Sequence, residues 1–200
     1  MTLDNIEELH YITPLANMGS IYTMGILSHK KAEKVTHQSV AMDEIQERRM
    51  KGVVPNGRPL HQYVNLYFHA RNPMMFKRRE SHKELCVVKV SKEVLSLPQV
   101  VITDGNASSD YVRFYPASEG LRVINKELVF AKYWKHDDPI EKFRHASIKC
   151  SEVLVPDKVP KTFILGAYVS CGESKVVLYD IMKAIKPDFA ITVNPDLFFQ

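Results

Sequence analysis

The sequence predicts an α+β fold, built from mixed, mostly antiparallel sheets with flanking helices. Short apolar, β-favouring runs alternate irregularly with short helical segments, and no β-α-β unit repeats along the chain. The 200 residues are 45% hydrophobic and 25% charged, a size and composition that fit one compact domain. We therefore expect residues 1–200 to form a single α+β domain.

The chain is expected to open with a strand and a short helix. Residues 9–13 are apolar and β-favouring, which predicts the strand. Asn17 is a residue type that caps helices and Gly25 one that ends them, so a helix is predicted over residues 18–24. Residues 30–37 are polar and irregular, and we expect a surface loop there.

A second helix is predicted to start after Ser39. Its apolar inner positions are Val40, Met42 and Ile45, and it ends near Arg49. The basic side chains of its last turn complement the helix dipole.

The middle of the chain reads as two strands separated by turns. Proline and glycine break regular structure over residues 53–59, and residues 63–68 are aromatic and β-branched, which predicts a strand. Asn72 and Pro73 turn the chain after it. Residues 85–90 are almost wholly apolar, as in a strand covered on both faces.

The second half mixes further short elements. Ser91 is expected to cap a short helix, residues 111–134 to hold one or two short helices, and Asp138 with Pro139 to begin a helix that reaches about residue 145. The remaining predictions are strands over residues 99–103, 152–155, 163–170 and 189–193, and a helix over residues 173–185.

Charge and motifs exclude several classes of protein. The amino terminus is acidic and no apolar run reaches membrane length, so we expect a cytoplasmic protein without a membrane anchor. Cys86, Cys150 and Cys171 are widely spaced, which predicts reduced thiols. P-loop, GxGxxG, HExxH and GxSxG motifs are absent, and His61 and His69 have no further ligands at metal-binding spacing, so no metal site is expected.

Basic side chains gather after the aromatic strand, between residues 71 and 83. Together with the one acid among them, Glu80, they account for the whole formal net charge of +4. Such a cluster beside aromatic residues can hold the phosphates of a nucleic-acid strand, or it can be a solvated loop. The five basic residues are Arg71, Lys77, Arg78, Arg79 and Lys83.

Two charged residues outside this cluster occupy ambiguous positions. Glu152 begins an apolar strand, where it is either an exposed strand-end acid or a carboxylate that requires a partner. Arg49 is by its position a helix-end cation. Neither residue identifies a reaction when it is taken alone.

Several segments follow one another in a characteristic order and spacing. They are YIT at residues 11–13 followed by Asn17 and by Met24-Gly25, IQERR at 45–49, LHQYVNLYF at 60–68 with ARNPMM at 70–75, TDGNA at 103–107 and SEVLV at 151–155. Together they resemble the DarT family, toxins of bacterial toxin–antitoxin pairs that ADP-ribosylate DNA. The similarity runs in register from about residue 9 to residue 160.

The resemblance implies an ADP-ribosyltransferase-like fold and a reaction with NAD as the ADP-ribose donor. The implied acceptor is a nucleobase of single-stranded DNA, with thymidine the commoner target of the family and guanine the target of one branch. Nicotinamide is released. The implied partner is a DarG-like macrodomain antitoxin that removes ADP-ribose from DNA.

Residue roles follow from the same resemblance. The catalytic arginine and glutamate of the family fall on Arg49 and Glu152. The implied NAD-binding residues are His10, Tyr11, Ile12, Thr13, Asn17, Ser20, Ser28, Arg49 and Tyr67. The implied DNA-binding residues are Tyr67, Arg71, Lys77, Arg78 and Arg79.

The sequence departs from the common DarT pattern on the first strand. Many members have His-Ile-Thr where this chain has Tyr11-Ile12-Thr13, and His10 lies one residue earlier. A shift of one residue reverses the face of a strand, so His10 cannot simply replace that imidazole. Two alternatives stay open: an NAD-dependent transferase that acts on RNA or protein, and a nucleic-acid-binding module without enzymatic activity.

Overall fold

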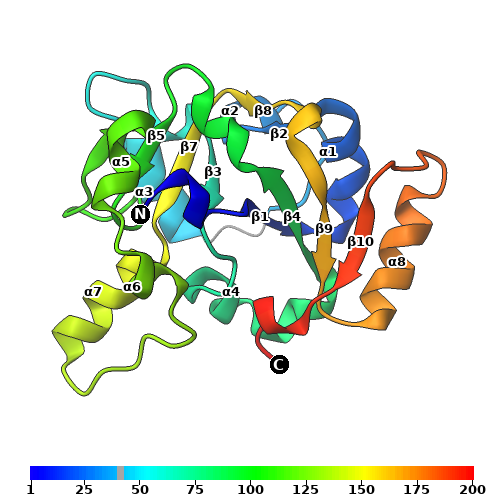
Figure 1. The fold of residues 1–200 in the computed structure, drawn as a ribbon. Coiled ribbons are helices and arrows are strands. Elements are labelled where there is room, and N and C mark those ends of the chain that lie inside the picture. Colours follow the sequence, from blue (N-terminus) through cyan, green and yellow to red (C-terminus); the bar gives the residue numbers. More distant parts are fainter. Residues whose placement is uncertain (40–42) are drawn as a thin grey trace.

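An eight-stranded sheet forms the centre of the computed structural model, which describes residues 1–39 and 43–200. The strand order is β10-β9-β4-β1-β3-β7-β5-β6, and β2 and β8 form a separate pair (Figure 1). The strands are β1 Glu8–Pro14, β2 Ile26–Leu27, β3 Tyr63–Tyr67, β4 Leu85–Ser91, β5 Val101–Thr103, β6 Phe114–Pro116, β7 Glu152–Pro156, β8 Lys158–Val159, β9 Ile164–Val169 and β10 Ala190–Val193.

Neighbouring strands run antiparallel except for β9 and β10, which α8 connects as a parallel pair. Figure 1 shows α1 and α8 at one end of the molecule and α5, α6 and α7 at the other. The helices are α1 Met18–Met24, α2 His29–Ala32, α3 Asp43–Lys51, α4 Pro73–Lys77, α5 Ala117–Val123, α6 Lys126–Phe130, α7 Pro139–Lys149 and α8 Gly172–Met182. The predicted α+β class, with mostly antiparallel pairing, is confirmed.

The core lies on both faces of the central strands, as the apolar run of β4 predicts. Side chains of a strand alternate between faces, so Cys86, Val88 and Val90 join the larger cluster, which also contains the buried residues of α1 and α8. Leu85 and Val87 join the smaller cluster on the other face, against the end of the chain. β4 is therefore covered on both sides.

Most predicted elements are present with shifted ends, but some predictions are wrong. Asn17 does not cap α1 with its side chain, because a 3₁₀ turn runs directly into the helix and already gives residue 17 a helical backbone. Residues 30–37 are not all loop, since α2 includes their first three residues. Asn72 and Pro73 do not merely turn the chain: Asn72 caps α4 by accepting a hydrogen bond from the Met75 N–H.

Other differences concern elements that the sequence predicted too short or missed. α7 continues to Lys149, one turn beyond the predicted end. β6 and β8 have three and two residues, too few for a periodic pattern. Val40 and Met42, expected on the inner side of the second helix, lie outside the described residues. Within the described ranges, no helix is both long and apolar enough to cross a membrane.

Gly25, which ends α1, tests how closely the chain packs against β8 at this point. Its φ is +85°, and a Cβ built there would lie 2.2 Å from the Val159 carbonyl oxygen, beside the β2–β8 pair. We expect Gly25→Ala to lower the free energy of unfolding by about 1–3 kcal/mol, because strain and a backbone clash coincide. Urea denaturation measures this change.

The matched control is Gly172→Ala. Gly172 begins α8, and a Cβ built on it would meet no atom within 4 Å. The effect of this substitution on unfolding should therefore stay within about 0.5 kcal/mol. Equal effects of the two substitutions would contradict this account of Gly25.

Candidate active site

The main sheet opens between β1 and β3. β1 pairs with β4 along its whole length, and β3 pairs with β7 along its whole length. β1 and β3, both fully described, pair with each other only at His10 and Tyr67. Because these antiparallel strands meet at one end and then diverge, residues 11–14 of β1 and residues 63–65 of β3 wall the two sides of a cavity.

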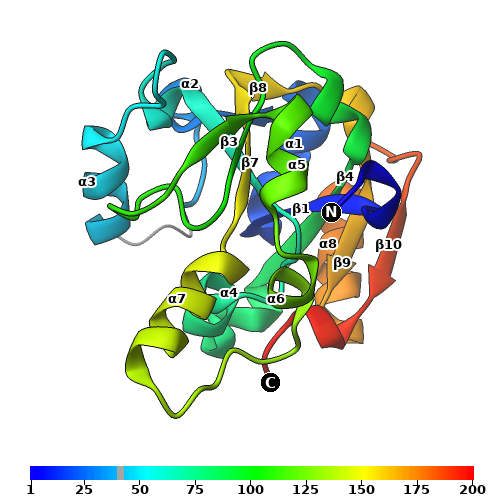
Figure 2. The ribbon, with the colours of Figure 1, turned by 60° about the vertical axis from the view of Figure 1, so that its left-hand side comes forward.

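Helices and loops from distant parts of the chain complete the cavity. Figure 2 shows α2 and α3 to the left of β3 and β7, and both helices contribute residues to the cavity lining. Arg49 and Glu152 are almost fully buried in its wall, whereas Lys77 is exposed at its rim. Further lining residues are Asn17, Leu27, His29, Gln46, Leu60, His61, Tyr67, Met74, Arg78, Asn106 and Cys150.

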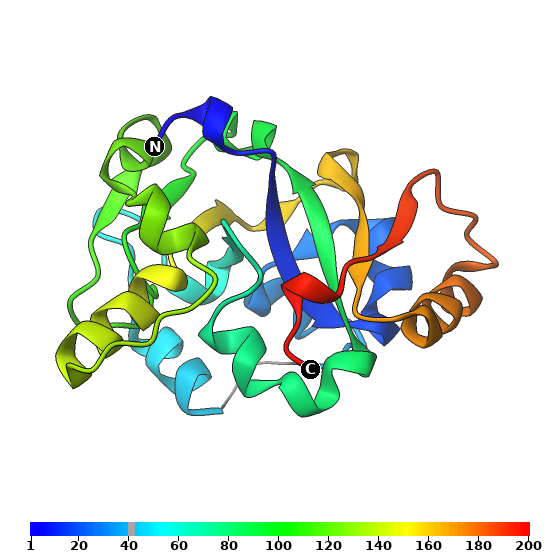
Figure 3. The ribbon, with the colours of Figure 1, turned by 60° about the horizontal axis from the view of Figure 1, so that its bottom comes forward.

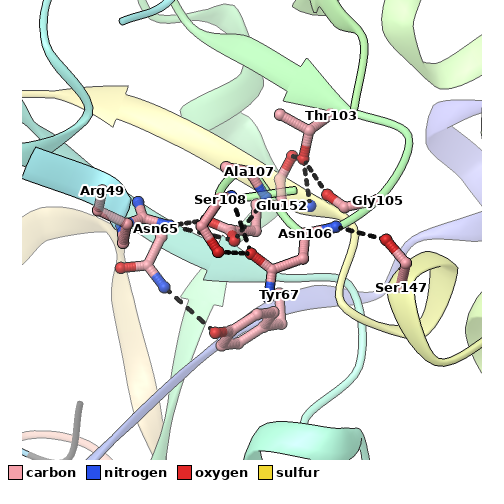
Figure 4. A network of polar contacts seen from close by, with 10 residues as sticks. All are labelled: Arg49, Asn65, Tyr67, Thr103, Gly105, Asn106, Ala107, Ser108, Ser147 and Glu152. Carbon is pink, nitrogen blue, oxygen red and sulfur yellow. Dashed lines mark hydrogen bonds and ion pairs between the residues drawn. The ribbon is translucent and has the colours of Figure 1, made fainter. Parts of the chain in front are cut away.

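Arg49 and Glu152 form an ion pair inside the cavity wall (Figure 4). The Arg49 Nη1 donates to Glu152 Oε2 at 2.9 Å and to Oε1 at 3.2 Å. The side chains are 7% and 1% exposed, so the pair is shielded from solvent on most sides. Glu152 is therefore a buried, partnered carboxylate, and the interpretation as an exposed strand-end acid is wrong.

Besides its partner Arg49, Glu152 has neighbours that stay uncharged. The Ala107 N–H donates to Glu152 Oε1 at 3.2 Å. Burial raises the pKa of Tyr67 well above its usual value, and the negative charge of Glu152 adds to this shift. Burial also raises the pKa of the Cys150 thiol to about 12. Both groups thus keep their protons at neutral pH beside the ion pair.

Unpartnered polar atoms are concentrated at this cavity. Buried polar groups in proteins are normally hydrogen-bonded. In the part of the chain that the structure describes, six side chains have a buried polar atom without a hydrogen-bond partner. Three of these atoms, Gln46 Oε1, Arg49 Nη2 and His61 Nε2, belong to residues that line the cavity. Their arrangement suits a polar ligand.

Two histidines in the wall were not predicted as part of the site. The rings of His29 and His61 lie 4.2 Å apart, centroid to centroid. Burial, followed by the charges of His29 and Arg49, lowers the pKa of His61, so its imidazole is neutral at neutral pH. His61 belongs to the LHQYV segment, but its sequence neighbours gave no sign of a contact with His29.

The cavity brings together six of the nine residues expected to bind NAD: Tyr11, Ile12, Thr13, Asn17, Arg49 and Tyr67. His10 does not line the cavity, although it shares a face of β1 with Ile12, and its Nδ1 accepts the Ala70 N–H at 2.9 Å. Ser20 lies outside the lining, because α1 turns Met18 and Ile21 to the core. Ser28 stands one position beyond the lining residue Leu27, and its buried Oγ has no partner.

The residues expected to bind DNA are also divided. Tyr67 lies in the cavity wall, and Lys77 and Arg78 line the cavity at α4. Arg79 lies outside it, with its guanidinium 4.7 Å from the centroid of the Phe76 ring.

Arg71 holds the end of the chain. Its Nη1 donates to the carbonyl oxygens of Asp196 and Phe198, and its guanidinium lies 4.0 Å from the centroid of the Phe199 ring. Figure 3 shows this red C-terminal segment beside the green helical turns that follow β3. The guanidinium is thus committed to the protein backbone.

This anchoring role predicts a loss of stability. Arg71→Ala should lower the free energy of unfolding by about 1–3 kcal/mol, because two carbonyl oxygens lose a charged donor and Phe199 loses a stacked cation. Lys77→Ala, an exposed neighbour on α4, should change it by no more than about 0.5 kcal/mol. Thermal and urea unfolding of both variants measure the difference. An unchanged stability of Arg71→Ala would refute the anchoring role.

The sequence and the structure of this chain were compared with those of known proteins. The family model described as "ssDNA thymidine ADP-ribosyltransferase, DarT" matches residues 10–199. A DNA ADP-ribosyl transferase–DNA ADP-ribosyl glycohydrolase fusion protein of Thermosipho africanus (strain H17ap60334) is 32% identical over 202 residues, which cover 96% of this chain and 50% of the fusion protein. The chain thus spans about half the length of that relative.

Two solved structures share the fold. Thermosipho africanus DarTG in complex with ADP-ribose has a TM-score of 0.82 and 30% identity, over 96% of this chain and 51% of that one. Thermus sp. 2.9 DarT in complex with ADP-ribosylated ssDNA has a TM-score of 0.82 and 25% identity, over 96% of both chains. With a family match over nearly its whole length and the same arrangement of strands and helices, this chain belongs to the DarT family.

Proposed function

We propose that this protein transfers ADP-ribose from NAD to a base of single-stranded DNA and releases nicotinamide. The observation that carries the proposal is the buried pair of Arg49 and Glu152 in the wall of the cavity between β1 and β3. The resemblance of the sequence to the family implies that these two residues are the catalytic pair. The description of the family and the relatives with ADP-ribose and modified DNA support the same reaction.

The polar groups of the cavity suit NAD as a substrate. Arg49 keeps one guanidinium nitrogen, Nη2, without a protein partner, and it can donate to a phosphate oxygen. Gln46 and His61 add an acceptor and an imidazole in the same wall. Tyr11 and Thr13 border the cavity along β1, where their hydroxyl groups can contact a ribose.

Glu152 supplies a negative charge that the bond-breaking step needs. When the bond between the ribose C1′ and the nicotinamide nitrogen breaks, nicotinamide leaves with the electron pair and the ribose becomes positively charged. A buried carboxylate stabilises that charge more in the transition state than in the ground state. A ring nitrogen of the base then bonds to C1′ and releases its proton to solvent water at the open side of the cavity.

Arg49 positions the substrates. A guanidinium stays protonated in proteins, so it is a poor proton acceptor. Its Nη1 fixes the orientation of the Glu152 carboxylate, and its Nη2 is left for NAD or the base. The arginine thus orders the reacting groups around the carboxylate.

The acceptor base must be unpaired, because a paired base hides its ring nitrogens inside the duplex. Lys77 and Arg78 line the cavity at the carboxyl end of α4, where they can contact phosphates. We propose thymidine as the target, in line with the description of the family. Guanine, the target of one branch, is the competing outcome of the test below.

The wider role follows from the relatives. We propose that the protein is a cytoplasmic toxin and that its partner is a DarG-like macrodomain that removes ADP-ribose from DNA, because one relative fuses a transferase to such a glycohydrolase. Residues 1–200 are proposed to act as one catalytic unit. Strands from both ends of the chain, β1 and β10, belong to the same sheet.

The reaction is tested with NAD labelled on its ADP-ribose and four single-stranded oligonucleotides, each lacking one base. We expect label on every strand that contains thymidine and none on a fully paired duplex. Glu152→Gln should reduce the rate at least about 100-fold, because it keeps the shape of the side chain and removes its charge. Glu8→Gln is the control, a partly buried, ion-paired carboxylate that lines a separate pocket with His10 and His69.

The same experiment separates the alternatives. Label that requires guanine would replace thymidine as the target. Label on RNA or protein but on no DNA strand would move the enzyme to another acceptor class, and no label on any acceptor would leave a nucleic-acid-binding module. Full activity of Glu152→Gln would remove Glu152 from its role.

A further inference from the structure

We propose that Thr103 is a positioning residue for Glu152, through a hydroxyl group that holds both the glutamate backbone and the loop over its carboxylate. This inference rests on the proposed function, because it assigns the support of the proposed catalytic glutamate. Thr103 and the TDGNA segment were part of the family resemblance but received no role from the sequence. Figure 4 shows the network.

The Thr103 hydroxyl makes two close hydrogen bonds in the interior, besides a longer contact of 3.5 Å with the Glu152 carbonyl oxygen. It accepts the Glu152 N–H at 3.0 Å and donates to the Gly105 carbonyl oxygen at 2.7 Å. Thr103 and Glu152 are 0% and 1% exposed, so water cannot replace either bond. One hydroxyl group thus joins the first residue of β7 to the loop that follows β5.

The hydroxyl acts where β5 leaves the sheet. β5 and β7 pair at Val101 with Leu154 and at Ile102 with Val153. At the next position the Glu152 N–H bonds to the Thr103 side chain instead of a backbone carbonyl. The pairing of β5 with β7 ends here, while the Asp104 N–H still bonds to the Arg113 carbonyl oxygen, and the chain then turns over the end of β7.

The turn brings the loop back to the carboxylate. Ala107, only four residues after Thr103, donates its N–H to Glu152 Oε1. Asn106 shapes the turn, since its Oδ1 accepts hydrogen bonds from both the N–H and the hydroxyl of Ser108. The five-residue segment 103–107 therefore forms hydrogen bonds with both the backbone and the carboxylate of Glu152.

α7 supports this loop from outside. Ser147 Oγ accepts the Asn106 N–H at 3.3 Å. A Cβ built on Gly105 would lie 2.7 Å from that oxygen, so the loop and the helix are in close contact. Ser147 offers a second way to loosen the loop without changing a residue that touches Glu152.

The test compares Thr103→Val with Thr103→Ser. Valine keeps the shape of threonine and removes both hydrogen bonds, whereas serine keeps the hydroxyl. We expect Thr103→Val to reduce kcat for transfer at least about tenfold, and up to about 100-fold, because a misplaced catalytic group costs rate. KM for NAD should stay within about twofold, since substrate binding is spread over many contacts. Thr103→Ser should keep wild-type kcat.

Equal kcat for Thr103→Val and wild type, or equal losses in the valine and serine variants, would overturn the proposal. If Thr103→Val does not fold, Ser147→Ala decides: the proposal expects a reduced kcat with unchanged KM, and an unchanged kcat overturns it.

A crystal structure of Thr103→Val separates this proposal from the proposed function. A displaced Glu152 carboxylate supports the positioning role even if wild type shows no transfer to DNA. An Arg49 Nη1 to Glu152 Oε2 distance that stays at the wild-type 2.9 Å refutes the positioning role even if DNA transfer is established.

Discussion

The ion pair between Arg49 and Glu152 is the interaction on which the site depends. It joins α3 to β7 across 103 residues of sequence, with both partners nearly excluded from solvent. Burying two charges has a large desolvation cost, and apolar residues of similar volume often replace such pairs without loss of stability. The ion pair lies in a cavity wall and leaves the Arg49 Nη2 unpartnered. A role in catalysis explains this position better than a contribution to stability does.

The sheet provides the space for that chemistry. β1 and β3 are each held by a full ladder on their outer side, to β4 and to β7, and touch each other at one residue pair. Rigid strands that diverge can bind a substrate between them without moving the core. Glu152 pairs with Tyr67 at the point where the divergence begins, so the carboxylate lies at the closed end of the opening.

Much of the fold could be predicted because strong local signals decide it. The apolar run of β4 and the glycine at the end of α1 need no distant partner to be recognised. The anchoring of the C-terminal segment by Arg71 could not be predicted. The sequence around a basic residue does not show whether its partners are phosphates or carbonyl oxygens far away in the chain. The family resemblance pointed to Arg49 and Glu152, but only three dimensions reveal their burial, the divergence of β1 from β3 and the role of Thr103.

The central claim is that Arg49 and Glu152 work as one unit on one bound NAD. A double-mutant cycle on the rate of ADP-ribose transfer tests it most directly, with Arg49→Lys, Glu152→Asp and the double variant, which keep charge and leave a measurable rate. Residues that act as a unit lose function together, so the double variant should be about as slow as the slower single variant. Losses that multiply would show two independent residues and contradict the account.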